Sequence, residues 1–100
     1  MAGADAHAPA VMRLSPRDNV AVALRPLKAG ESVPLDGAVL TIERNTAVGQ
    51  KLAAQPIAAG EIILKYGCPI GRAMQPVAPG AHVDAHNLKS EYLQTDTPPG

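Results

Sequence analysis

Residues that could carry out chemistry are concentrated near the end of the chain, in residues 82–87 (HVDAHN). If this stretch is extended, His82, Asp84 and His86 point to the same side, because side chains alternate along a strand. Strand residues two positions apart are separated by about 6.6 Å, so their side chains can share one metal ion, whereas His82 and His86 would be about 13 Å apart. Asp84 and His86 are therefore the predicted metal ligands, in a site that needs further ligands from elsewhere. The alternative is an edge strand whose polar side chains face solvent.

The remaining reactive side chains are isolated. Cys68 is the one cysteine, which excludes an internal disulfide and a multi-cysteine zinc site and is typical of a small apolar filler. His7 falls in a small-residue N-terminal stretch and is predicted to be inert. Lys65 and Arg72 are candidates for binding a substrate carboxylate, although scattered cations are ordinary surface residues. We find no glycine-rich phosphate loop, serine nucleophile motif or pair of catalytic carboxylates.

The elements that must position these residues are short. The apolar runs are bounded by glycine or proline, and several are rich in β-branched residues, which favours strands over helices. Ten prolines and nine glycines in 100 residues also argue against long helices. The sequence therefore predicts an all-β fold in which short helical turns are allowed. The main predicted strands lie in residues 20–24, 38–42, 61–66 and 81–83.

A glycine-centred pattern recurs along the chain: an apolar residue, two residues, glycine, two residues and a second apolar residue. Such a pattern predicts a turn with glycine at positive φ, flanked by side chains that enter a shared core. Its spacing of 30, 20 and about 20 residues is too irregular for a solenoid and favours a barrel-like β domain. The copies begin at Leu27, Ile57 and Val77, with a looser fourth copy at Thr46.

Length and composition limit the chain to one small domain. Nine basic and nine acidic residues give a net charge of zero, so the basic excess of a nucleic-acid-binding protein is missing. With no Phe or Trp, the core must be built from Ala, Val, Ile and Leu. Neither a signal peptide nor a membrane span is predicted, so the expected location is cytoplasmic, with no membrane partner. We expect a flexible N-terminus in residues 1–12, a domain in residues 13–90 and a flexible tail in residues 91–100.

Several of these motifs together resemble the altronate/galactarate dehydratase family. The resemblance extends from about Leu14 to Leu88, and its most specific parts are the Lys-Tyr-Gly-x-x-Ile-Gly motif that begins at Lys65 and the closing His-Asn-Leu. The segments that carry it are residues 13–24 (RLSPRDNVAVAL), 27–31 (LKAGE), 49–61, 65–73 (KYGCPIGRA) and 80–88 (GAHVDAHNL).

The resemblance implies a SAF domain with a β-clip fold. In that family the domain is either the N-terminal part of a long dehydratase or a separate small subunit, and sulfolactate sulfo-lyase has a similar small subunit. The family eliminates water or sulfite from sugar acids and related hydroxy acids, typically with a divalent metal, often Fe²⁺. The expected function is thus a hydro-lyase small subunit that completes the active site of a large catalytic subunit and is inactive alone. Which acid is the substrate remains open.

Comparison with the family pattern assigns roles to individual residues and also finds two departures. Lys51, His86 and Asn87 match and are the expected catalytic residues. Gln50 and Asp84 stand where the family usually has histidine; aspartate can still bind a metal, but glutamine is a poor ligand and cannot act as a base. The alternative function is therefore a non-catalytic carbohydrate-binding or assembly module. A lone β domain has unpaired strand edges that a second copy could cover, so a homo-oligomer is a further alternative.

Overall fold

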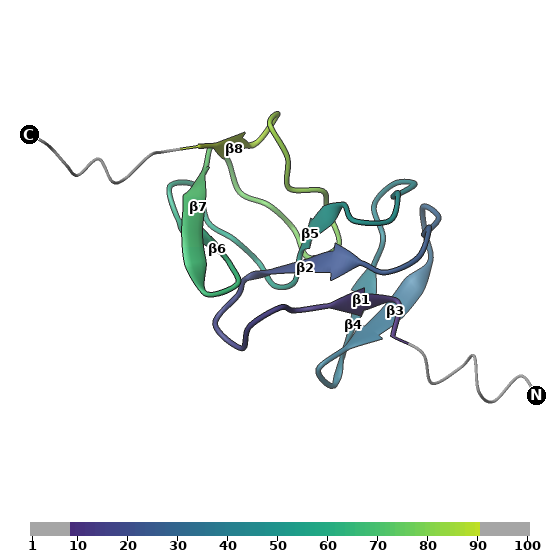
Figure 1. The fold of residues 1–100 in the computed structure, drawn as a ribbon. Coiled ribbons are helices and arrows are strands. Elements are labelled where there is room, and N and C mark those ends of the chain that lie inside the picture. The colour runs from purple at the N-terminus through teal and green to yellow at the C-terminus, as the bar shows by residue number, and fades with distance from the viewer. Residues whose placement is uncertain (1–8, 91–100) are drawn as a thin grey trace, which may run out of the picture.

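Residues 9–90 form eight short strands connected by turns (Figure 1). We analysed a computed structural model that describes residues 9–90, and no helix occurs among these residues. The all-β prediction is thus confirmed. The strands are β1 (Val11–Met12), β2 (Val20–Ala23), β3 (Ser32–Leu35), β4 (Ala38–Thr41), β5 (Lys51–Ala53), β6 (Ile62–Lys65), β7 (Cys68–Ala73) and β8 (Leu88–Lys89).

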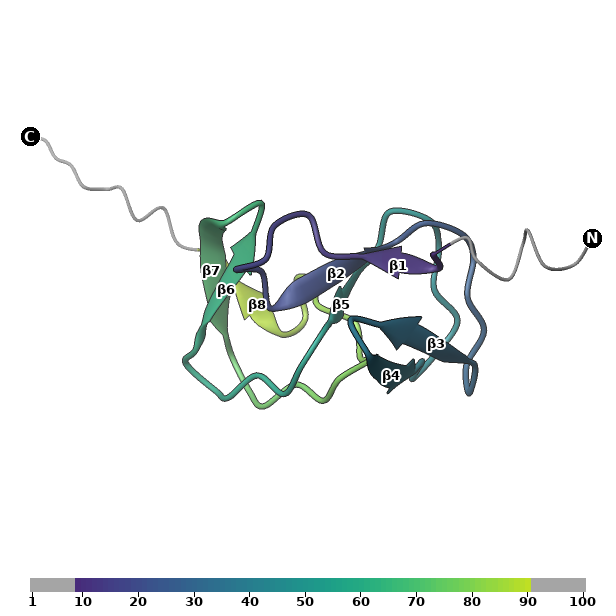
Figure 2. The same cartoon turned by 90° about the horizontal axis from the view of Figure 1, so that it is seen from below.

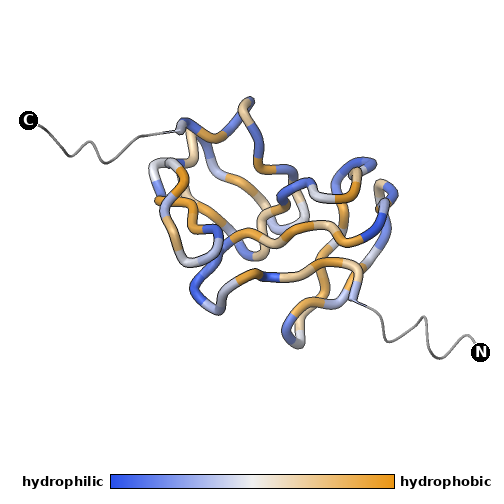
Figure 3. Tube along the Cα trace, in the orientation of Figure 1, coloured by the Kyte–Doolittle hydropathy of each residue, from blue (hydrophilic) through white to orange (hydrophobic). Residues whose placement is uncertain are grey.

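The strands form three small antiparallel sheets. The central sheet has the order β1-β2-β5, and it lies between the β3–β4 hairpin and the three-stranded sheet β6-β7-β8 (Figures 1 and 2). Buried aliphatic side chains fill two core clusters, one around Leu27, Leu40 and Leu52 and the other around Ile57 and Ile63. In Figure 3 the most hydrophobic segments accordingly include the central strands. Among the described residues the buried hydrophobic side chains are all Ala, Val, Leu or Ile, as predicted.

The glycine-centred turns reveal an internal repeat of about 30 residues. Leu27 exchanges both backbone hydrogen bonds with Thr46, and Ile57 does the same with Val77, so each half of the domain contains one pair of turns. The uneven spacing therefore reflects two copies per repeat, rather than an irregular series. The turn glycines Gly30, Gly49, Gly60 and Gly80 all have φ between 83° and 88°, and both positions flanking each of them in the pattern are buried.

The hairpins of the two repeats are equivalent. Each has a two-residue turn with both residues at positive φ, Asp36-Gly37 between β3 and β4 and Tyr66-Gly67 between β6 and β7. Such turns match the natural twist of paired strands. The second hairpin differs by a bulge, because Ile63 pairs with Gly71 while Leu64 pairs with Pro69. The extra residue explains why the repeat is 30 residues long at its start and 31 at its end.

The packed domain begins earlier than expected. Ala10 and Val11 are buried, and the Leu24 amide donates to the Ala10 carbonyl at 2.8 Å. Residues 10–12 therefore pack with the central sheet, ahead of the expected domain start at residue 13, and the flexibility of the N-terminus stays a prediction. Residues 1–8 of the predicted N-terminus and the predicted tail, residues 91–100, lie outside the described residues.

Two consecutive buried polar residues connect the first repeat to the tip of the second hairpin. The carboxyl group of Asp18 accepts from the amides of Ser15, Tyr66 and Gly67 at 2.7–3.1 Å. The Asn19 side chain accepts from the amide of Leu64 and donates to a carbonyl of β6. This Asp18–Asn19 clamp satisfies backbone groups that the β6–β7 hairpin leaves unpaired.

Candidate functional site

Residues 84–87 form a tight turn instead of the extended strand considered from sequence. The Asp84 carbonyl accepts from the amides of Asn87 and Leu88 at 3.0 and 2.8 Å, and the Asp84 carboxylate accepts from the His86 amide. Aspartate favours such a turn because its short side chain reaches the backbone two residues further on. The turn removes the expected alternation, so His82 does not share a face with Asp84 and His86.

His82 is buried, at 5% exposure, and pairs with a threonine from the first repeat. Its Nε2 lies 2.8 Å from the Thr46 hydroxyl, which in turn donates to the Arg44 carbonyl. Because a hydroxyl has one proton to donate, all three groups are satisfied when His82 Nε2 donates to Thr46 and Thr46 donates to the Arg44 carbonyl. His82 thus serves as a hydrogen-bonded core residue between the two repeats.

Asp84 and His86 form a solvent-accessible hydrogen-bonded pair through His86 Nδ1, with side chains 38% and 48% exposed. The pKa of Asp84 is lowered, first by the hydrogen bond from the His86 amide, then by the His86 side chain and, more weakly, by the charges of His86 and Arg44. Since Nδ1 faces the carboxylate, Nε2 is the ring nitrogen left for a ligand or a proton. An imidazole oriented by a carboxylate in this way is suited to proton transfer.

Asn87 holds this turn together from inside. It is 3% exposed, its side-chain oxygen accepts from the Asp84 amide, and its side-chain nitrogen donates to the His82 carbonyl. Its own carbonyl accepts from the Met74 amide at 2.8 Å. The contacts of Asn87 thus position Asp84 and His86; its predicted catalytic role stays a prediction.

The backbone of Lys51 lies beside this segment, and the predicted catalytic role of Lys51 stays a prediction. The Lys51 carbonyl accepts from the Val83 amide at 3.0 Å, and Leu52 forms a β-bridge with His82. Gln50 precedes β5 and is half-buried. The second repeat therefore returns the chain to the start of β5, which brings together two motifs that are far apart in sequence.

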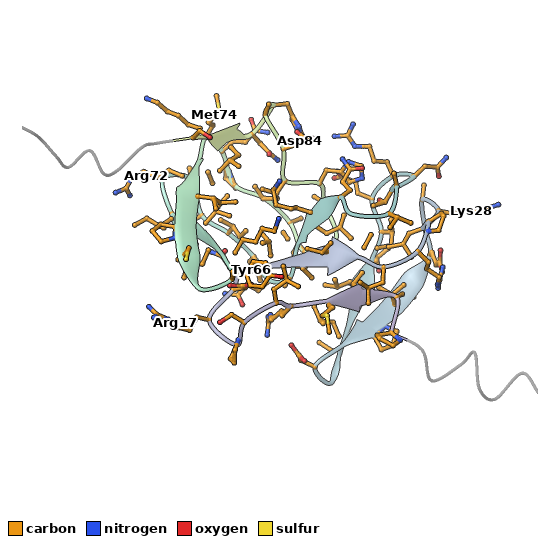
Figure 4. The ribbon with its side chains drawn as sticks, viewed as in Figure 1. Arg17, Lys28, Tyr66, Arg72, Met74 and Asp84 are labelled. Carbon is orange, nitrogen blue, oxygen red and sulfur yellow. The ribbon has the colours of Figure 1, made fainter. Side chains whose placement is uncertain are left out.

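The two predicted carboxylate-binding residues are not brought together. Lys65 pairs with Cys68 at the turn end of the β6–β7 hairpin, whereas Arg72 pairs with Ile62 at the opposite end. Of the two, Arg72 lies nearer to the Asp84–His86 pair. The chain continues from β7 to Met74, whose amide donates a hydrogen bond to the Asn87 carbonyl. Figure 4 shows Arg72 and Met74 on the side of the molecule that carries Asp84. Cys68 is exposed, and His7 lies outside the described residues.

The described residues do not form a complete metal site. No group of three or more His, Cys, Asp or Glu side chains is arranged to hold a metal ion within residues 9–90. Asp84 and His86 supply two donors, which bind each other. The donor set of this part of the chain therefore does not fit a resident divalent metal by itself.

Sequence reasoning missed Arg44 and Thr46, which the fold places beside residues 80–84. Thr46 and His82 are 36 positions apart, so no local pattern connects them. One signal was present, because Thr46 is the polar member of the repeated turn motif, at a position that is aliphatic in the other copies. A polar residue at a core position needs a buried partner.

Replacing Thr46 with valine should destabilise the domain by about 1–3 kcal/mol, since both His82 Nε2 and the Arg44 carbonyl lose their partner while the side-chain volume is retained. Urea unfolding followed by circular dichroism measures this loss. Thr46→Ser keeps the hydroxyl and is expected to lose less than half as much. Equal losses in the two variants would show that the methyl group, not the hydrogen bond, stabilises the site.

A surface hollow of about 370 Å³ lies elsewhere and contains none of the predicted site residues. It is lined by Arg13, Leu14, Ser15, Pro16 and Asp36. The Arg13 guanidinium is already bound to Asp36 and to the Gln55 side chain. In the described part of the chain there is no helix long and apolar enough to span a membrane.

The short strands and paired glycine turns form an all-β domain, in agreement with the fold of a SAF domain. The family described as the altronate/galactarate dehydratase SAF domain matches residues 9–91, and the chain belongs to this family. The resemblance seen in the sequence is thereby confirmed.

Among known proteins, the chain is similar to altronate dehydratase from Escherichia coli, with 43% identity over 79 residues, and to that from Bacillus subtilis, with 35% identity over 79 residues. Each match covers 79% of this chain but 16% of the relative. It is also similar to (2R)-sulfolactate sulfo-lyase subunit alpha from Chromohalobacter salexigens, with 41% identity over 44% of this chain and 47% of the relative. The chain thus spans about a sixth of the altronate dehydratases it matches.

Proposed function

We propose that this domain is the small subunit of a sugar-acid dehydratase and completes an active site on a large catalytic subunit. Its membership of a dehydratase SAF family supports the lyase class, and its similarity to proteins named as alpha subunits supports a role within a complex. The observation that carries the proposal is the Asp84–His86 pair, held at the surface by the buried Asn87.

The pair supplies a proton-transfer group to the shared site. Elimination of water removes the proton next to the substrate carboxylate and protonates the departing hydroxyl group. His86 Nε2 performs one of these transfers, and Asp84 orients the ring through Nδ1. A divalent metal, expected from the family, would need further ligands from the large subunit, so the steps assigned to this chain use protein groups alone.

The test is dehydration by the complex reconstituted from this chain and the large subunit, screened with aldonic, aldaric and sulfonated hydroxy acids. His86→Ala should lower kcat by about 100-fold or more, the usual size of a general acid or base effect. His7→Ala makes the same chemical change outside the described fold and should leave the rate unchanged. If His86→Ala alters neither the rate nor the metal content of the complex, the proposed role of this subunit is wrong.

A second function, a non-catalytic binding or assembly module, is favoured by the incomplete ligand set within residues 9–90. It predicts that the chain binds a partner and that dehydration proceeds equally well with the His86→Ala variant. Co-purification with the large subunit is expected under both functions, so the rate of the variant complex distinguishes them.

A further inference from the structure

Hydrogen bonds hold residues 41–46 beside residues 80–84, and this packing places Arg44 next to the candidate site. The Glu43 amide donates to the Gly80 carbonyl at 3.2 Å, and Thr46 joins the Arg44 carbonyl to the His82 ring. Gly80 also packs directly against the Thr41 carbonyl. Arg44 is therefore held between two anchored residues, next to the segment that leads into Asp84.

As far as residues 9–90 are concerned, the guanidinium of Arg44 is available for a ligand. Arg44 is exposed and forms no hydrogen bond or ion pair through its side chain with any other residue in 9–90. Its charge contributes to the lowered pKa of Asp84, yet the Asp84 carboxylate is paired with His86, so Arg44 is not its ion-pair partner. Arg44 therefore interacts with Asp84 through its charge alone. Within residues 9–90, the N–H donors of its guanidinium have no acceptor.

Other arginines of the domain either have hydrogen-bond partners or lie away from the Asp84–His86 pair. Arg13 binds Asp36 and Gln55, Arg25 binds Glu31, and Arg72 donates to the Gly60 carbonyl. Arg17, which is also exposed, lies in the loop before β2, and Figure 4 shows it on the side of the molecule opposite Asp84. Arg44 thus combines an open guanidinium with a position next to the Asp84–His86 pair.

We propose that Arg44 binds the carboxylate of a hydroxy-acid ligand and holds that ligand against His86. The inference rests on the proposed function for the class of ligand. A planar guanidinium can bind a carboxylate with two parallel hydrogen bonds, which fixes both the position and the orientation of the acid. The positive charge also offsets the repulsion that the anionic Asp84 exerts on an anionic ligand. Arg44 is thus proposed as a carboxylate-binding residue beside the pair, while the roles of Lys65 and Arg72 stay predictions.

Binding can be tested on the full chain by NMR, with D-gluconate as the probe and sorbitol as a neutral polyol of matching length. Gluconate should shift the Arg44 Nε–Hε resonance and the amides of residues 84–87, and sorbitol should not. Arg44→Gln should weaken gluconate binding at least 10-fold, whereas Arg17→Gln, which changes the net charge equally, should have little effect. Arg44→Lys should recover part of the binding, because a point charge is kept and the two-pronged contact is lost.

Equal gluconate affinity in the wild type and Arg44→Gln would overturn the proposal, as would the absence of any gluconate-dependent shift in the wild type. An equal weakening by Arg17→Gln would also overturn it, since only net charge would then be involved. In the reconstituted complex Arg44→Gln should raise KM more than it lowers kcat. Retained dehydration in the His86→Ala complex would refute the proposed function while leaving gluconate binding by Arg44 intact, so the two failures are distinguishable.

Discussion

Replacing Gly80 with alanine is expected to cost the domain a large part of its free energy of unfolding. An added Cβ would lie 2.0 Å from the Thr41 carbonyl oxygen and 2.8 Å from its carbon, and Gly80 has φ +88°. The neighbouring atoms are backbone, so no side chain can rotate away. A loss of about 4 kcal/mol or more is expected, against a total of roughly 5–15 kcal/mol for a typical domain. Urea unfolding at 25 °C measures the loss.

Gly30 provides a matched control for this prediction. It occupies the corresponding position of another copy of the turn, with φ +85°, and an added Cβ would meet no atom within 4 Å. Gly30→Ala therefore carries only the cost of a left-handed alanine, about 1–2 kcal/mol. The difference between the two variants isolates the close approach of Gly80 to Thr41. Similar losses in both variants would contradict the packing argument and assign the whole effect to backbone conformation.

The Gly80 contact also matters for the site. It lies where residues 41–46 meet residues 80–84, and the Glu43–Gly80 and Thr46–His82 hydrogen bonds extend from it. A partly folded Gly80→Ala chain should therefore lose the position of Arg44 relative to Asp84. Gluconate binding should fall in that variant even at temperatures where much of the β structure remains.

The core of the domain could be predicted because it depends on local chemistry. Glycine at positive φ between two core residues is a local property of each turn, and it identified the buried positions of all four copies, such as Leu27 and Val33. The pairing of the copies into two repeats could not be predicted, because it depends on hydrogen bonds such as those between Leu27 and Thr46, which connect distant parts of the chain.

The chemistry of the site was only partly predictable for a similar reason. The sequence singled out Asp84 and His86, which do form a pair, but an extended strand was the wrong geometry for His82. The turn forms because Asp84 and the buried Asn87 bind the local backbone, which strand alternation does not take into account. Arg44 was missed because its place at the site depends on long-range packing.

The second large effect is expected at Asp18. Asp18→Asn keeps the shape of the side chain but replaces one acceptor oxygen with an NH₂ group, which then faces a backbone N–H. The side chain is buried and accepts from three amides, two of them in the Tyr66-Gly67 turn. A buried donor without an acceptor costs about 1–3 kcal/mol, and the weakened remaining bonds bring the expected loss to roughly 2–4 kcal/mol. Urea unfolding and hydrogen exchange of the hairpin amides measure it.

Asp36→Asn is the matched control, because Asp36 occupies the equivalent hairpin turn of the first repeat. Its side chain is 57% exposed, and its carboxylate forms a surface ion pair with Arg13. Such pairs contribute about 0–1 kcal/mol, and asparagine tolerates the positive φ of this position, so little stability should be lost. If Asp36→Asn lowered the free energy of unfolding as much as Asp18→Asn, the loss in both variants would come from removing the negative charge. It would not come from leaving buried amides without an acceptor.

The Asp18→Asn variant also tests whether the two ends of the β6-β7-β8 sheet respond independently of each other. Asp18 holds the turn end of the β6–β7 hairpin, where Lys65 lies, while Met74 and β8 connect the other end to Asn87 and the Asp84–His86 pair. Under conditions where Asp18→Asn is still folded, exchange should increase at residues 64–67 and remain unchanged at residues 84–88. Gluconate binding should then be retained, because Arg44 and His86 do not depend on the clamp. A loss of binding in the folded Asp18→Asn chain would instead place the carboxylate site at the Lys65 end of the sheet.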